Sequence, residues 1–152
     1  MHKSARRPDL RTRSVWLAIL GVLFYSSYSI ANGLAAARGD VPSAVFGWEQ
    51  YVPFIEWTII PYWTTNFFYA ASLFVIPTRP MLGAHIKRLV TAQIVAVTCF
   101  LLWPLQFTFA RPEATGALSG WLYDVLGGFD KPFNQAPSLH IALTIIPVSY
   151  TH

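Results

Sequence analysis

Residues 15–37, VWLAILGVLFYSSYSIANGLAAA, contain no Asp, Glu, Lys or Arg. A transmembrane helix needs about 20 apolar residues to cross roughly 30 Å of hydrocarbon, and this stretch is long enough. Two further uncharged stretches of similar length follow at residues 58–77 and 89–110, and a shorter apolar run occupies residues 139–152. The sequence therefore predicts an all-α integral membrane helical bundle with three full spans and the start of a fourth.

The composition also favours a membrane protein. The chain has 152 residues, of which 54% are hydrophobic and 12% charged, whereas soluble domains carry about 25% charged residues. So short a chain cannot enclose this much apolar surface in a soluble core, so we expect the lipid bilayer to be a partner. The basic residues that give a net charge of +4 flank the apolar stretches, and we therefore expect no nucleic-acid binding. The single cysteine, Cys99, provides neither a disulfide framework nor a metal motif.

The distribution of charge predicts which side of the membrane each loop faces. Eight of the eleven basic residues lie in the N-terminal tail or in the loop after the second apolar stretch. Six of the seven acidic residues lie within residues 38–56 or 111–138. Lys and Arg concentrate in cytoplasmic loops. We therefore expect a plasma-membrane or inner-membrane protein with a cytoplasmic N-terminus, in which residues 38–56 and 111–138 face the periplasm or lumen.

Two alternatives stay open in the N-terminal half. The basic tail, the first apolar stretch and the alanines at 35–37 also fit a cleaved signal peptide, although the apolar stretch is longer than usual. Residues 45–57 mix aromatic residues with two glutamates, which fits either a segment along the outer interface or an ordinary ordered loop. We divide the chain into a cytoplasmic basic tail (1–14), a membrane domain (15–147) and a more polar end (148–152) that we expect to be non-native.

Two short clusters beside the second outer loop are candidates for chemistry. Arg111-Pro112 follows the third apolar stretch, and NQAPSLH, residues 134–140, precedes the last apolar run. The guanidinium of Arg111 offers a planar fork of donors that matches phosphate oxygens. A lone arginine at such a position is more often an interfacial residue that pairs with lipid.

The second cluster combines a predicted helix start with two polar side chains. Pro137 suits the first turn of a helix, whose free N–H groups favour anions. Ser138 adds a hydroxyl donor, and His140 can act as a general acid near neutral pH. By itself this pattern also fits a helix cap followed by a polar interfacial histidine. Together with Arg111, however, the cluster supplies what phosphoryl transfer requires, because charge gathers on phosphate oxygens in its transition state.

Arg-Pro followed by Pro-Ser-x-His resembles the first two signature motifs of the type 2 phosphatidic acid phosphatase superfamily. The form N-x-x-P-S-L-H is similar to the branch that contains inositolphosphoryl-ceramide synthases. The resemblance covers roughly residues 89–147, and it implies a multi-span helical enzyme whose site opens on the outer or lumenal face without a metal or other cofactor. It also implies that Arg111 binds phosphate, Ser138 stabilises the phosphoryl oxygens and His140 protonates the leaving oxygen.

The sequence departs from the family pattern at two places. The family usually has a lysine seven positions before the arginine of its first motif, where this chain has Pro104; the inositolphosphoryl branch often lacks this lysine too. The third family motif, with a nucleophilic histidine and an aspartate that orients it, has no counterpart. His152 follows His140 by only twelve residues, with no aspartate after it. We therefore expect a chain that is truncated and inactive by itself.

These observations predict a phosphoric monoester hydrolase, a membrane phosphatase for lipid or other amphiphilic phosphates that uses a histidine nucleophile in the complete protein. One alternative is a phosphotransferase of the inositolphosphoryl-ceramide synthase type. Another is a non-catalytic membrane protein that binds lipid headgroups. A transporter or channel subunit is less favoured, because the predicted spans contain no Asp, Glu, Lys, Arg or His.

Overall fold

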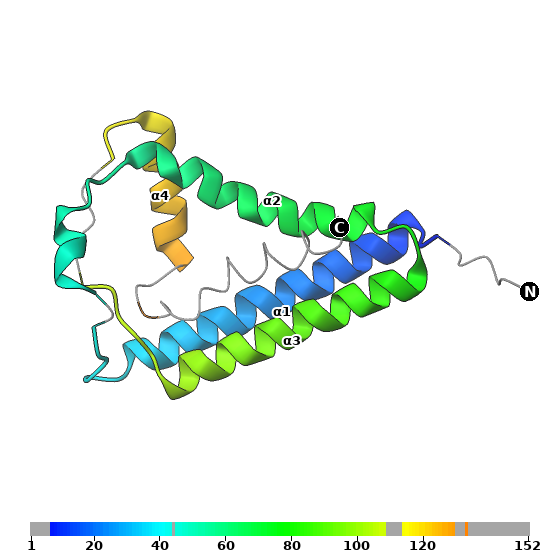
Figure 1. Ribbon diagram of the computed structural model, residues 1–152, viewed down its shortest axis with the longest axis horizontal. Coiled ribbons are helices and arrows are strands. Elements are labelled where there is room, and N and C mark those ends of the chain that lie inside the picture. Colours follow the sequence, from blue (N-terminus) through cyan, green and yellow to red (C-terminus); the bar gives the residue numbers. More distant parts are fainter. Residues whose placement is uncertain (1–6, 44, 109–113, 130–132, 134–152) are drawn as a thin grey trace, which may run out of the picture.

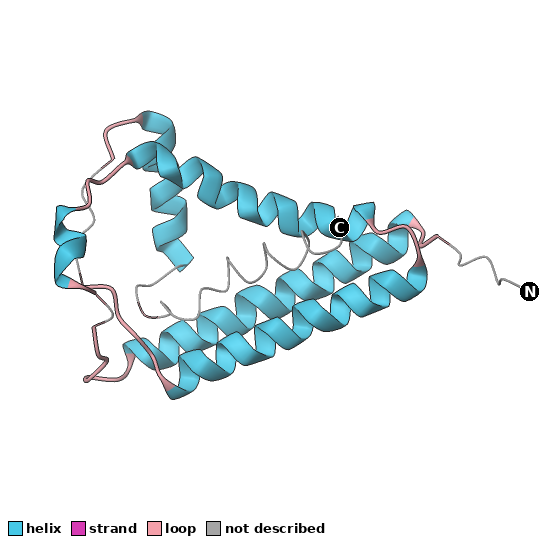
Figure 2. Ribbon diagram, in the orientation of Figure 1, coloured by secondary structure: helices cyan, strands magenta, loops and turns pink. Residues whose placement is uncertain are grey.

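The computed structural model describes residues 7–43, 45–108, 114–129 and 133. This part of the chain is helical and contains no strand, so the predicted all-α fold is confirmed for it. Its elements are α1 (Leu10–Ala36), η1 (Gly47–Tyr51), η2 (Glu56–Thr58), α2 (Ile59–Val75), α3 (Arg79–Leu102) and α4 (Ala117–Phe129), where η denotes a short 3-10 helix. Loops connect these helices, as Figure 2 shows.

The helices α1 and α3 lie side by side and run in the same direction (Figure 1). α2, which lies between α1 and α3 in the sequence, runs in the opposite direction. It is close to both helices at the turn that leads into α3, and it lies farther from them toward its own N-terminus (Figure 1). We call the end of the molecule at that turn, with the start of α1, the basic end. At the opposite end, called the α4 end, α4 runs across the direction of α1 and α3 (Figure 1).

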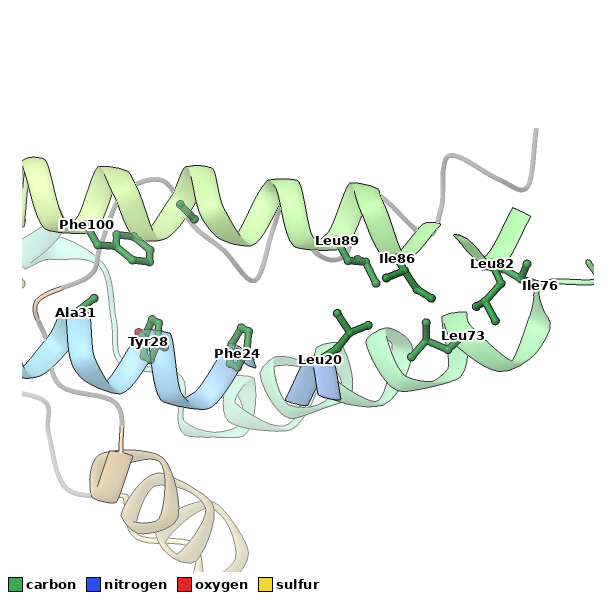
Figure 3. Close-up of a cluster of buried hydrophobic side chains, with 11 residues drawn as sticks. Leu20, Phe24, Tyr28, Ala31, Leu73, Ile76, Leu82, Ile86, Leu89 and Phe100 are labelled. Atoms are coloured by element: carbon green, nitrogen blue, oxygen red, sulfur yellow. The ribbon is translucent and has the colours of Figure 1, made fainter. Parts of the chain in front are cut away.

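The main hydrophobic core joins α1 to α3. Its α1 side chains recur every three or four positions, which places them on one helix face. Tyr28 meets Phe100 edge to face, with ring centroids 6.0 Å apart. Figure 3 shows this seam, which consists of Leu20, Phe24, Tyr28 and Ala31 of α1, Leu82, Ile86, Leu89, Ala96 and Phe100 of α3, and Leu73 and Ile76 at the end of α2.

Two of the described helices, α1 and α3, are long and apolar enough to cross a membrane. Only 22% of the most apolar part of α1 and 33% of that of α3 is buried, whereas the core helix of a soluble protein is mostly buried. α2 has 17 residues, at the short end of the range of about 17–25 for a span. Three full spans are therefore not confirmed, and the apolar run at 139–152 lies outside the described residues.

The boundaries predicted for the third span are wrong. The helix α3 begins ten residues before the predicted stretch and ends eight residues before its end. The hydroxyl of Thr78 accepts a hydrogen bond from the backbone N–H of Met81, 3.4 Å away, and Pro80 lies in the first turn. Both features start a helix. Lys87 is exposed on α3, so its charge does not interrupt the helix.

Pro61 and Pro104 fall within the second and third uncharged stretches, and neither interrupts a helix. Pro61 lies in the first turn of α2, where its missing N–H has no intrahelical partner to lose. Pro104 lies beyond the last residue of α3, where the chain leaves the helix. The tolerance of membrane helices for internal proline is therefore not needed here.

Candidate functional site

The three predicted catalytic residues, Arg111, Ser138 and His140, lie outside the described residues. The structure does describe chain on both sides of Arg111, and it describes Phe133 just before the motif at 134–140. All these flanking residues belong to the α4 end of the molecule. The contacts of these flanking residues therefore show which segments the chain beside each motif is bonded to.

The chain that leaves α3 toward Arg111 is paired with two other segments. The backbone N–H of Leu105 donates to the carbonyl of Phe133 at 3.2 Å, and that of Gln106 donates to the carbonyl of Pro42 at 2.9 Å. Ser43 and Gln106 form an isolated parallel bridge. The hydroxyls of Ser43 and Thr108 lie 3.1 Å apart. Three segments distant in sequence therefore meet beside the end of α3.

The chain that follows Arg111 is fixed by Glu56, the first residue of η2. Its carboxylate accepts hydrogen bonds from the backbone N–H of Thr115 at 2.8 Å and from that of Gly116 at 3.1 Å. It also accepts from the hydroxyls of Thr115 at 3.1 Å and Ser119 at 3.3 Å. The free N–H groups before a helix normally need such an acceptor. Glu56 thus caps α4 from 59 residues away in the chain.

The environment of Glu56 keeps its side chain ionised. The hydrogen bond from the Gly116 backbone and that from the Thr115 hydroxyl lower the pKa of Glu56 below its ordinary value of 4.5. Negative charge is also favourable at the N-terminus of a helix such as α4. A side chain at Gly116 would bring a Cβ within 2.5 Å of the Ser119 Oγ, so glycine suits this close approach.

These contacts fix the described residues on both sides of residues 109–113. On one side Thr108 contacts Ser43, and on the other side Thr115 is bonded to Glu56. Ser43 and Glu56 both belong to the connection between α1 and α2, which the sequence predicts to face outward. The connection between α1 and α2 therefore binds the chain both before and after the residues around Arg111.

Sequence reasoning missed both Glu56 as a cap and the helix it caps. Residues 111–138 were expected to form an outer loop, and α4 lies within them. The repeat of large apolar residues in ALSGWLYDVL is a helical signal that could have revealed α4. No pattern in the sequence links Glu56 to Thr115, because that contact depends on how α2 is placed.

A separate cavity of about 130 Å³ lies between α1 and α2, away from these contacts. Its lining is mainly apolar and includes no cationic side chain, so it does not offer a phosphate site of the kind predicted around Arg111. The residues around it are Leu17, Gly21, Phe24 and Tyr25 of α1 and Asn66, Tyr69 and Ala70 of α2.

In the part of the chain that the structure describes, no three His, Cys, Asp or Glu side chains come together in a way that could hold a metal ion. Comparisons with protein-family models, with curated proteins and with solved structures found no match. The family resemblance therefore depends on Arg111-Pro112 and the motif at 134–140.

Proposed function

We propose that this chain forms the phosphate-binding part of a membrane phosphatase that acts on lipid or other amphiphilic phosphates at the outer membrane face. The observation that supports this proposal most directly is the hydrogen bond from Leu105 to Phe133. It joins the segment that leads to Arg111 with the residue that precedes the 134–140 motif. This contact between the chain before each cluster supports the proposal that the two clusters serve one phosphate site.

In the proposed site each residue has a distinct task. The guanidinium of Arg111 binds two phosphate oxygens through two parallel N–H hydrogen bonds. Ser138 donates its hydroxyl to a phosphoryl oxygen as charge develops in the transition state. His140 gives its proton to the oxygen of the leaving alcohol. The nucleophile would be the histidine of the family's third motif, which this sequence does not contain and the complete protein would supply. It would bond to phosphorus as the bond to the leaving oxygen breaks, and water would then hydrolyse the phosphohistidine to release inorganic phosphate.

The separation of charge between the two ends supports placing this site on the outer face. Asp9 pairs with Arg79 at the basic end, where the N–O distance is 3.3 Å. Lys87 and Arg88 lie on the part of α3 nearest to that end. Because basic residues favour the cytoplasmic side, the α4 end with the predicted site is assigned to the periplasm or lumen.

The proposal is tested by replacing Arg111 and His140 by alanine in the complete protein. Release of inorganic phosphate from a short-chain phosphatidic acid in detergent micelles should fall at least a hundredfold in each variant, because the phosphate clamp or the proton donor is lost. Arg38→Ala is the matched control, since Arg38 bonds the Leu101 carbonyl at 2.8 Å rather than a substrate. Unchanged phosphate release by Arg111→Ala or His140→Ala would contradict the assignment.

A second candidate function, phosphotransfer, is favoured by Pro104. This residue occupies the position where the phosphatases of the family carry a lysine, and it is buried, so no cation is available there. The two functions are separated by adding an alcohol such as inositol to the assay. Phosphatase activity predicts free phosphate in amounts that the alcohol does not change, whereas a transferase would convert the phosphate into an ester. Tight binding without either product would indicate a headgroup-binding protein.

A further inference from the structure

One face of α4 is apolar and exposed. Leu118 is 62% exposed, Trp121 61% and Val125 37%. Positions three and four apart share a face of an α-helix, so these three side chains form a single stripe. The opposite side packs inward through Ser119 and Leu126, both of which are buried.

The orientation of α4 is fixed by contacts on its inward side. Glu56 holds its N-terminus through hydrogen bonds to Thr115 and Gly116. Farther along, the ring of Tyr123 lies against that of Phe54, with centroids 5.5 Å apart. With these two attachments α4 runs across the direction of the candidate spans α1 and α3 (Figure 1). A helix in this orientation lies along a bilayer that α1 and α3 cross.

Other segments at the α4 end also expose large apolar side chains. The segment with η1 and η2 exposes large aromatic side chains, and so does the residue after α3. Aromatic rings, tryptophan above all, favour the headgroup region, where one edge is wet and the other apolar. These residues are Phe46 (63% exposed), Trp48 (64%), Tyr51 (80%), Trp57 (62%) and Trp103 (68%).

We propose that α4 is an interfacial helix whose Leu118, Trp121 and Val125 insert into the outer leaflet of the bilayer. The occupant of this face is lipid rather than a protein, because the candidate spans α1 and α3 also expose large apolar side chains and a bilayer would cover both. Leu102, at the end of α3, is 59% exposed. Asp124 is also exposed, and its position on the helix places it beside the stripe rather than within it. Amphipathic helices bind membranes with this division of faces.

This proposal does not depend on the phosphatase assignment, and its test needs no activity. In a Cys99→Ser background, a nitroxide spin label is attached to a single cysteine at position 118, 121 or 125. The protein is reconstituted into vesicles of phosphatidylcholine and phosphatidylglycerol. Oxygen, which concentrates in lipid, and a water-soluble nickel complex then report the surroundings of each label by collision. Thr98, exposed on α3, supplies the lipid reference, and Asp40 supplies the water reference.

The proposal predicts a ratio of oxygen to nickel collisions at 118, 121 and 125 that is several-fold higher than at the matched position Asp124→Cys. A ratio like that of the Asp40 reference would show a water-exposed face and overturn the proposal. Low collision rates with both reagents would show a face covered by protein and would overturn it equally. The three labelling positions are separate variants, so misfolding of one leaves the test intact.

Discussion

At the two ends of the molecule, side chains of opposite charge bond the free backbone groups at helix ends. At the basic end, the Arg13 guanidinium donates to carbonyls at the end of α2, with distances of 3.0 Å to Leu73 and 2.9 Å to Ile76, and it also contacts the Phe74 carbonyl. At the α4 end, the Glu56 carboxylate accepts from the N–H groups that precede α4. Each side chain satisfies helix-end groups that lack intrahelical partners.

The two ends differ in what surrounds these charges. Arg13 is buried at 8% exposure and lies beside the core residues Leu73 and Ile76. Glu56 is only partly buried, and it lies outside the main hydrophobic core. The comparison teaches that the basic end is held by a packed core with a buried clamp, whereas the start of α4 is held by hydrogen bonds to a partly exposed carboxylate. Segments held through exposed hydrogen bonds open more easily than segments held by a packed core.

The largest effect is expected from breaking the clamp at the basic end. Arg13→Ala removes the donor to the carbonyls of Leu73, Phe74 and Ile76, and hydrogen bonds to a buried charged group are worth roughly 1.5–3 kcal/mol each. We expect a loss of about 3 kcal/mol in unfolding free energy, measured by thermal unfolding in detergent. Arg11→Ala, at an exposed position on the same helix, is the control and should leave stability unchanged. Equal effects of the two variants would show that the clamp contributes nothing.

A smaller effect is expected from loosening the pair of helices that connects the two ends. The Gln93 amide on α3 donates to the Ser27 hydroxyl on α1 at 2.7 Å. Hydrogen bonds between membrane helices average about 0.6 kcal/mol, so Gln93→Leu should cost no more than about 1 kcal/mol. Thr98→Val is the control, because the Thr98 hydroxyl bonds only a carbonyl of its own helix. A loss as large as that of Arg13→Ala would mean that the core seam is weaker than its packing implies.

The smallest effect on global stability, and the most local one, is expected at Glu56. Because the folded protein lowers the pKa of Glu56, the cap is complete above about pH 4.5 and is lost as the pH falls through the lowered pKa. Hydrogen exchange at the Thr115 and Gly116 amides should therefore be faster in Glu56→Gln at pH 7, and the difference should shrink under acid. Glu49→Gln is the control. Equal protection in wild type and Glu56→Gln at pH 7 would show that Glu56 does not cap α4.

Much of the helical core could be predicted, because a long uncharged run has few alternatives to a helix. The second stretch, predicted at 58–77, is matched closely by α2. The start of α3 was misplaced because charged residues were taken to end the apolar segment, although Thr78 and Pro80 already marked a helix start. Charges at exposed positions do not interrupt a helix, and only the folded structure shows which positions are exposed.

The candidate site was less predictable than the core. The residues expected to carry chemistry were chosen by motif, and the structure describes their flanks rather than the residues themselves. The support those flanks receive from Ser43 and Glu56 joins positions more than 55 residues apart. Such contacts depend on the placement of whole helices, and local residue patterns contain no information about them.

The most direct test of the central claim is a cross-link between Arg111→Cys and His140→Cys in a Cys99→Ser background. The protein is placed in sealed vesicles, and a short, charged reagent that joins two thiols and does not cross membranes is added from the outside. The proposal predicts an intramolecular cross-link that forms without lysis, because both thiols then lie close together at the outer face. Reaction of only one thiol, or a cross-link that appears only after lysis, would contradict a shared phosphate site on the outer face.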